Sequence, residues 1–286
     1  MKRTALAILI TLALAAAGAN AQSTPNTLGK IKSAKAINVA FATDSLPFAW
    51  VNPQNQPAGY SIDLCKRVIA HIGRVVGQPD LKVNWMPGGA ADRVQMVASG
   101  KADLECGNTS QTLTRLAIVD FSNLIFIDGG GFVVRAGSPI AKLLDMGGKK
   151  IAVLKGTTTE ARLKAELAKR TVNATLVPIN DGMEGMALLE AGSVDAYAGD
   201  KVKLIGLAAQ SKDPSKLALL PEDFSFEPYA FALPRNDSAF RLEVNRALTQ
   251  VYTSTDLDAI FTQWLGPLGR PSGLLAAMYL LNAIPE

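Results

Sequence analysis

The chain has 286 residues, of which 48% are hydrophobic and 19% are charged, with 29 Lys and Arg against 25 Asp and Glu. Without Lys2 and Arg3 at the extreme N-terminus, 27 Lys and Arg face 25 Asp and Glu, a formal charge of +2. This near-neutral balance, with no basic tract, makes nucleic acid an unexpected partner.

The N-terminus has the three parts of a secretory signal peptide. Lys2 and Arg3 form a basic start, residues 5–17 are apolar, and a motif of small residues ends at Ala21. The apolar run is too short for a comfortable membrane span. We therefore predict that residues 1–21 are a signal peptide cleaved after Ala21 and that the mature protein is periplasmic.

The first half of the mature chain alternates strand-like and helix-like segments. After a polar leader at 22–36, apolar runs predict strands at residues 37–41, 81–86 and 102–106. Between them, an amphipathic helix is expected to begin with Ser61 as its cap, and a second helix covers residues 92–98. This order predicts a parallel sheet with helices on both faces.

The second half repeats this plan after two apolar segments that Gly129, Gly130 and Gly131 interrupt. The glycines suit a close backbone approach or a bending point between two lobes. Strands are expected at residues 151–154, 174–178, 194–199, 217–220 and 229–233, and helices at 240–253, 257–264 and 274–284.

The two cysteines, Cys65 and Cys106, lie on the first predicted helix and the third predicted strand. Export would place them in an oxidising compartment, so a disulfide and two buried free thiols both remain open. The single histidine, His71, is not at coordinating spacing from Cys65. No metal and no cofactor are therefore expected.

Small polar side chains follow the third predicted strand, where ligands bind in open α/β sheets. Asn108 and Ser110 lie in this turn, and Arg115 lies in a short helix capped by Thr112. A guanidinium beside a helix N-terminus can hold a carboxylate. The alternative is an ordinary surface turn with a solvated arginine.

The equivalent places in the second half hold Thr158 and Asp200. If these residues face the first half across a cleft, Thr158 would supply a hydroxyl for a ligand's carboxylate. Asp200 would supply a carboxylate for a ligand's ammonium. An amino acid needs both. The alternative is that each is an ordinary helix cap.

Four segments resemble the periplasmic amino-acid-binding proteins of ABC importers, the family 3 extracellular solute-binding proteins. They are GYSIDLCKRV at 59–68, SGKADLECGNTSQTLTRLAIVDFS at 99–122, KGTTTEARL at 155–163 and GSVDAYAGD at 192–200. The similarity extends over about residues 37–264, and the ECG and LPF segments are similar to the glutamate/aspartate-binding branch.

The resemblance implies an α/β protein with the type II periplasmic-binding fold, in which two α/β lobes joined by two hinge strands close on a ligand. Lobe 1 would comprise residues 22–131, lobe 2 residues 132–229, and residues 230–286 would return to lobe 1 and form a C-terminal tail. The partners implied are an amino acid and an inner-membrane ABC permease, and the protein is expected to be a monomer.

The resemblance also implies residue roles. Arg115, helped by Ser110 and Thr158, would bind the ligand's α-carboxylate, and Asp200 would bind the α-ammonium with Asn108 nearby. Each buried charge of the ligand would then be paired.

Departures from the family concern the ligand's side chain. Ala42 stands where glutamate/aspartate binders carry an Arg and binders of basic amino acids an Asp, and Gly182 lies near the place of a His. Arg93 matches a further ligand-side Arg or is a salt-bridging helix residue. Phe48 is a candidate aromatic contact, although core packing is the alternative. These positions favour a polar or modest-sized amino acid, with a glutamate-like ligand still open through Arg93.

Two other functions use the same fold. Some periplasmic dehydratases acting on prephenate or arogenate share it, and would need an acid or base in the cleft. The available carboxylates are Asp44, Glu105, Glu184 and Glu227. None has a visible partner in the sequence, so the chain is not expected to be an enzyme. A ligand-sensing partner of a membrane receptor would use the same site as a transport protein.

Overall fold

The computed structural model of the chain describes residues 26–285, so the predicted signal peptide lies outside the described residues. Nine strands form one large sheet. They are β1 (Ala36–Phe41), β5 (Lys82–Pro87), β6 (Leu104–Glu105), β7 (Asp120–Arg135), β8 (Lys150–Leu154), β9 (Thr175–Ile179), β10 (Ala196–Asp200), β11 (Leu217–Leu219) and β12 (Ser225–Leu233). Within the described range, no helix has the length and apolar character needed to cross a membrane.

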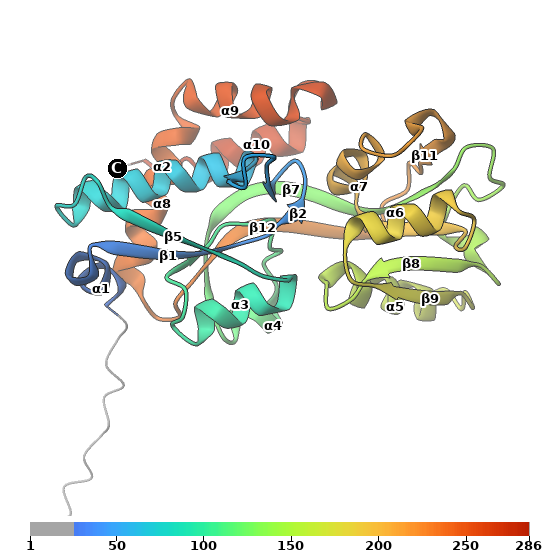
Figure 1. The fold of residues 1–286 in the computed structure, drawn as a ribbon, viewed down its shortest axis with the longest axis horizontal. Coiled ribbons are helices and arrows are strands. Elements are labelled where there is room, and N and C mark those ends of the chain that lie inside the picture. The colour runs from blue at the N-terminus through green and yellow to red at the C-terminus, as the bar shows by residue number, and fades with distance from the viewer. Residues whose placement is uncertain (1–25, 286) are drawn as a thin grey trace, which may run out of the picture.

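The sheet runs through both lobes in the order β5-β1-β6-β12-β7-β10-β8-β9, and β11 also pairs with β7. Strands β5, β1 and β6 are mutually parallel, as are β10, β8 and β9. The long central strands β7 and β12 pair antiparallel and extend from one lobe into the other (Figure 1). A small three-stranded sheet of β2 (Asp44–Ser45), β3 (Ala49–Val51) and β4 (Pro57–Ala58) accompanies the first lobe.

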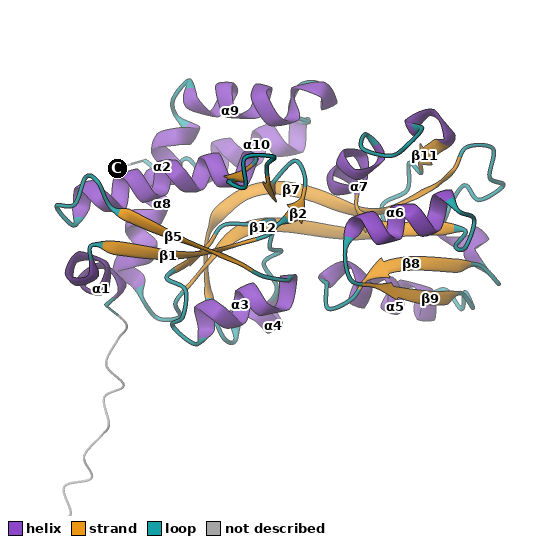
Figure 2. Cartoon of the chain, viewed as in Figure 1, coloured by secondary structure: helices purple, strands orange, loops and turns teal. Residues whose placement is uncertain are grey.

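Helices cover this sheet in both lobes (Figure 2). Those of the first lobe are α1 (Thr27–Ala34), α2 (Tyr60–Val75), α3 (Ala90–Ala98), α4 (Leu113–Leu116), α8 (Ser238–Tyr252), α9 (Asp256–Leu265) and α10 (Gly273–Asn282). Those of the second lobe are α5 (Thr158–Lys169), α6 (Gly182–Glu190) and α7 (Lys201–Ala208). The predicted α/β class is confirmed.

Separate apolar clusters fill the two lobes. The largest joins α2 and α8 to β1 and to the first-lobe ends of β7 and β12, with buried members such as Ile62, Val68 and Phe240. Two smaller clusters of the second lobe contain residues from 132 to 224. This division agrees with lobes that meet on β7 and β12, while the exact boundaries at 131/132 and 229/230 stay a prediction.

Three local predictions were wrong. The polar leader includes a helix, α1, because the side chain of Asn26 caps its Gly29 N–H and Ile31 is fully buried. Helix α2 begins after Gly59, and Ser61 is not its cap. Strand β7 is continuous through Gly129–Gly131, where two shorter strands were expected.

The glycines of β7 are explained by close approach. A Cβ on Gly130 would lie 2.3 Å from Ser225 Oγ, and one on Gly131 would lie 2.7 Å from carbons of the Lys201 side chain. Both distances are far inside van der Waals contact. The triple glycine therefore lets β12 and α7 pack against the strand that joins the lobes, without interrupting its hydrogen-bond ladder.

Candidate functional site

A cavity of about 680 Å³ lies between the lobes, at the carboxyl ends of the parallel strands. In the first lobe its lining follows β1, β5 and β6. In the second lobe its lining follows β8, β9 and β10. Among the lining residues are Asp44, Arg93, Asn108, Ser110, Arg115, Thr158, Asp181, Asp200 and Lys203. Six of the eight site residues predicted from the sequence are thus brought together.

The first-lobe wall is built on the turn after β6. Thr112 caps α4 by accepting a hydrogen bond from Arg115 N–H at 3.2 Å, as predicted. Arg115 Nη1 donates to the Ser110 carbonyl at 2.8 Å, which holds the guanidinium against the turn. Burial lowers the pKa of Arg115, but an arginine stays charged at neutral pH. Since a guanidinium has five N–H donors, most remain for a ligand.

Both hydroxyls expected to hold a carboxylate donate instead to a carboxylate of the protein. Ser110 Oγ lies 2.5 Å and Thr158 Oγ1 2.9 Å from Glu227 Oε2. Glu227 is fully buried on β12, and its other oxygen accepts from Ser225 Oγ at 2.7 Å. Burial, followed by the charge of Asp200, raises the pKa of Glu227. Sequence reasoning considered Glu227 only as a candidate catalytic acid, although a glutamate beside a buried strand is itself a signal of a polar network.

The second-lobe wall presents Asp200 at the end of β10. Its two oxygens accept hydrogen bonds from Thr159 Oγ1 and Tyr229 Oη, each at 2.5 Å. Tyr229 Oη also lies 3.3 Å from Asp128 Oδ2 on β7. Burial and the charge of Asp200 raise the pKa of Asp128 to about 8, so at neutral pH Asp128 is largely protonated and can donate in return.

A second contact across the cleft joins Asp44, considered from the sequence only as a candidate catalytic carboxylate, to Gly182 and to Lys203, which the sequence did not place in the site. Asp44 Oδ2 lies 3.4 Å from Lys203 Nζ and 3.4 Å from the Gly182 N–H. Burial alone would raise the pKa of Asp44, but the charge and hydrogen bond of Lys203, together with the Gly182 N–H and the charge of Arg93, outweigh burial and the pKa is lowered. This pairing joins β2 of the first lobe to α6 and α7 of the second. Asp44 and Lys203 are far apart in sequence, so no local motif could predict it.

Arg93 has both of the properties proposed for it. It lines the cavity, and its Nε forms a buried ion pair with Glu105 Oε1 at 2.8 Å. Its two other nitrogens donate to the Gly88 carbonyl at 3.1 Å and to Thr109 Oγ1 at 3.3 Å. Each nitrogen of the guanidinium therefore already has a partner in the protein.

Ala42 and Phe48 do not line the cavity, which corrects their expected place in the site. Both are fully buried in the first-lobe core. The ring of Phe48 packs edge-on against Phe126 and Tyr229, with centroid separations of 4.9 and 5.1 Å. An apolar ring gains more from this packing than from a polar cleft.

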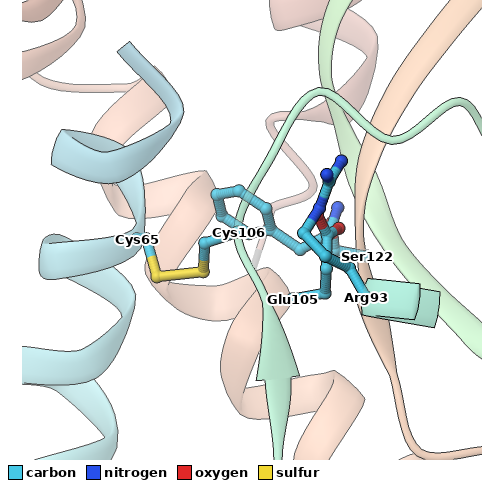
Figure 3. The surroundings of a disulfide bond; sticks show 6 residues. Cys65, Arg93, Glu105, Cys106 and Ser122 are labelled. Carbon is cyan, nitrogen blue, oxygen red and sulfur yellow. A yellow bond between two sulfur atoms is a disulfide. The ribbon is translucent and has the colours of Figure 1, made fainter. Parts of the chain in front are cut away.

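Cys65 and Cys106 form a disulfide between α2 and the end of β6, with Cα atoms 6.0 Å apart. This settles the choice that the sequence left open. Cys106 directly follows Glu105, the last residue of β6, and their side chains point in opposite directions, so Cys106 faces α2 while Glu105 faces Arg93 (Figure 3). The disulfide thereby anchors the strand from which the turn carrying Asn108 and Ser110 leaves. Among the described residues, no group of three or more His, Cys, Asp or Glu side chains could hold a metal ion.

Two α/β lobes around one polar cleft, joined by two antiparallel strands, define a two-lobe binding protein of the type II periplasmic-binding fold. The family described as bacterial extracellular solute-binding proteins, family 3, matches residues 37–267, and the chain belongs to this family. The resemblance found in the sequence is thus confirmed.

Individual relatives agree with this assignment. The chain is 31% identical over 270 residues to an L-glutamate/L-aspartate-binding protein of Pseudomonas aeruginosa, covering 94% of this chain and 89% of the relative. It is 27% identical over 259 residues to a glutamate/aspartate import solute-binding protein of Escherichia coli, covering 91% and 86%. A solved structure of an ancestral arginine-binding protein bound to glutamine aligns with a TM-score of 0.72 and 27% identity, covering 81% of this chain and 98% of that one.

Proposed function

We propose that the protein is a non-enzymatic, periplasmic solute-binding protein that captures an amino acid between its lobes and delivers it to an ABC permease. The relatives described above are named for binding or importing amino acids, which supports this class. The predicted export signal, outside the described residues, supports the periplasmic location.

The observation that carries the proposal is the placement of Arg115 and Asp200 on opposite walls of one cavity. An amino acid needs a cation for its carboxylate and an anion for its ammonium, and burying either group unpaired is costly. Asp200 is held in place by two hydrogen bonds, and Arg115 is held against Ser110. Both charged groups are therefore oriented before a ligand arrives, which lowers the entropic cost of binding.

The α-carboxylate would also meet the N-terminus of α5. Thr157, Thr158 and Thr159 line the cavity there, and Thr157 Oγ1 caps the helix by accepting from Glu160 N–H at 3.1 Å. The first N–H groups of a helix have no partner within the helix and favour an anion. Because the hydroxyls of Ser110 and Thr158 donate their hydrogen bonds to Glu227, we assign the main carboxylate contacts to Arg115 and these N–H groups.

The carboxylates that a dehydratase would need are mostly placed elsewhere. Glu105, Glu184 and Glu227 do not line the cavity, and Asp44 is paired with Lys203. This arrangement supports binding over catalysis. Incubation with prephenate, followed by the absorbance of phenylpyruvate, should show no turnover above the uncatalysed rate.

Calorimetry on protein unfolded, stripped of ligand and refolded tests the proposal. We expect at least one amino acid to bind at micromolar or tighter affinity. Absence of binding by all twenty amino acids and their common derivatives would contradict it. Mass spectrometry of a small molecule that co-purifies would identify the ligand directly.

A further inference from the structure

The lobes meet at a second place across the cleft, which bears on the ligand's side chain. Near the hinge strands, Thr158 Oγ1 lies 3.4 Å from Ser110 Oγ. The second meeting place is the contact of Asp44 with Lys203 and Gly182. Asp44 follows β1, which is separated from the hinge strands by β6, and Gly182 follows β9, the outermost strand of the second lobe. The Asp44 contact therefore lies farther from the hinge than the subsite of Arg115 and Thr158.

The cations near this outer part of the cleft are already paired. Lys203 has a side chain that is 8% exposed, and its ammonium lies against Asp44. Arg93 is 4% exposed and is engaged by Glu105, Gly88 and Thr109. A third cation of the lining, Lys155, is exposed to solvent, where its charge is screened.

The lining as a whole carries no net formal charge. Its four acidic members are Asp44, Asp92, Asp181 and Asp200, and its four basic members are Arg93, Arg115, Lys155 and Lys203. Arg115 and Asp200 together match the two charges of an amino-acid backbone. The remaining charges balance one another, so the cleft offers no surplus charge to a charged side chain.

Asp44 is held on the second-lobe side by the start of α6. The Gly182 N–H faces its carboxylate, and a helix N-terminus favours an anion. A Cβ on Gly182 would lie 2.7 Å from Leu207 Cδ1, so α6 and α7 pack too closely there for a larger residue without a shift. At the start of α6, Asp44 therefore faces a backbone N–H group. No basic side chain at position 182 competes with a ligand for its carboxylate.

We propose that Asp44 is a specificity-determining residue that restricts the cleft to amino acids with an uncharged, hydrogen-bond-donating side chain. The inference rests on the proposed amino-acid-binding function and adds the class of ligand. A hydroxyl or amide N–H can donate to Asp44 while Lys203 keeps its partner. Each carboxylate oxygen accepts more than one hydrogen bond, so both contacts can coexist.

Charged side chains are disfavoured for different reasons. A second carboxylate on the ligand would meet Asp44 while Lys203 and Arg93 are both engaged. A basic side chain would have to take Asp44 from Lys203 and leave a buried ammonium unpaired, which is strongly unfavourable. The dicarboxylic amino acids named for the relatives should therefore be poor ligands here.

Calorimetry with the ligand-stripped protein at neutral pH tests this directly. The panel comprises serine, threonine, asparagine and glutamine, then aspartate and glutamate, then lysine and arginine. We expect at least one neutral polar member to bind about 100-fold more tightly than any charged member, because a buried charge without a partner costs that much or more. Tightest binding of aspartate or glutamate would overturn the inference while leaving the proposed function standing.

The variant Asp44→Asn tests the residue itself. It keeps the shape of the side chain but frees the charge of Lys203, so the affinity for glutamate or aspartate should rise about tenfold or more. The matched control is Asp80→Asn, which removes the same charge from an exposed position outside the cleft and should leave the ligand preference unchanged. No gain for acidic ligands in a folded Asp44→Asn variant would overturn the assignment. If that variant does not fold, as judged by thermal denaturation, the wild-type panel still decides.

Discussion

The Ser110 hydroxyl donates to the Glu227 carboxylate at 2.5 Å, although the family resemblance implies that this hydroxyl would help to bind the ligand's carboxylate. Thr158, from the opposite lobe, donates to the same carboxylate oxygen. A carboxylate of the hinge strand β12 is thus a common acceptor for one hydroxyl from each wall of the cleft. Only the hydroxyl of Ser110 or Thr158 would separate the α-carboxylate of a bound ligand from the buried carboxylate of Glu227.

Replacement of Glu227 by Gln should therefore strengthen binding at pH values where Glu227 is ionised. Like charges a few ångströms apart repel by about 1–2 kcal/mol when partly screened, so the affinity should rise roughly tenfold. Because the pKa of Glu227 is raised, the wild type should also bind more tightly as the pH falls and the group takes up its proton. Calorimetry as a function of pH measures both effects.

A control for this variant is Glu166→Gln, since Glu166 on α5 pairs with Arg170, the residue after the helix, and does not line the cavity. It should leave both the affinity and its pH dependence as in the wild type. Weaker binding by the Glu227→Gln variant at every pH would show that the charge supports the site by orienting Ser110 and Thr158.

Loss of Arg115 should remove binding. In Arg115→Ala the ligand's carboxylate would be buried without its partner, and the affinity should fall by about 100-fold or more. Isothermal titration with the wild-type ligand measures this. Arg74→Ala, on the exposed surface of α2, is the matched control and should bind normally. An unchanged affinity of Arg115→Ala would remove Arg115 from the site.

Asp128 should make folding stability depend on pH. Its pKa is raised to about 8, first by burial and then by Asp200. A carboxyl with a raised pKa holds its proton more tightly in the folded than in the unfolded chain. Its contribution to stability is therefore full below its ordinary pKa and is lost as the pH rises through the folded value.

The free energy of unfolding should accordingly fall between about pH 5 and about pH 8, by at most about 1.4 kcal/mol per pH unit for one proton. Urea denaturation across this range measures the slope. Asp128→Asn should remove this component whether or not it changes the overall stability. If the slope persists in the variant, another group, such as Glu227, is its source.

Removal of the disulfide should destabilise the protein by about 3–4 kcal/mol, because the loop between the two cysteines is long. The sequence separation is 41 residues. The double variant Cys65→Ala/Cys106→Ala, compared with the wild type by urea denaturation, measures the loss. Ligand affinity should fall as well, since Cys106 anchors the strand that leads into the turn of Asn108 and Ser110. Equal stability with and without the bond would contradict this role.

The parts of the site that follow from local sequence were well predicted. Parallel strands bring their carboxyl ends to one edge of a sheet, so the polar residues after β6, β8 and β10 had to converge. That placed Ser110, Arg115, Thr158 and Asp200 on one cleft. The Thr112 cap followed from the same local reasoning.

The parts that depend on tertiary packing were not predicted. Whether Phe48 faces the cleft or the core depends on Phe126 and Tyr229, which lie far along the chain. The pairing of Asp44 with Lys203 depends on how the lobes approach each other. A periodic pattern contains neither kind of information, so the sequence left Phe48 open between cleft and core and did not pair Asp44 with Lys203.

The hinge of this molecule is a piece of sheet. Strands β7 and β12 keep paired residues from Asp120 and Leu233 at one end to Gly130 and Ser225 at the other, with register irregularities between Tyr229 and Ala232. Opening of the cleft would then bend a hydrogen-bonded ribbon, with no ladder to break and remake. Backbone amides at the hinge should therefore stay protected from hydrogen exchange with solvent in both the open and the closed form. The lobes would move by elastic bending of this two-stranded ribbon.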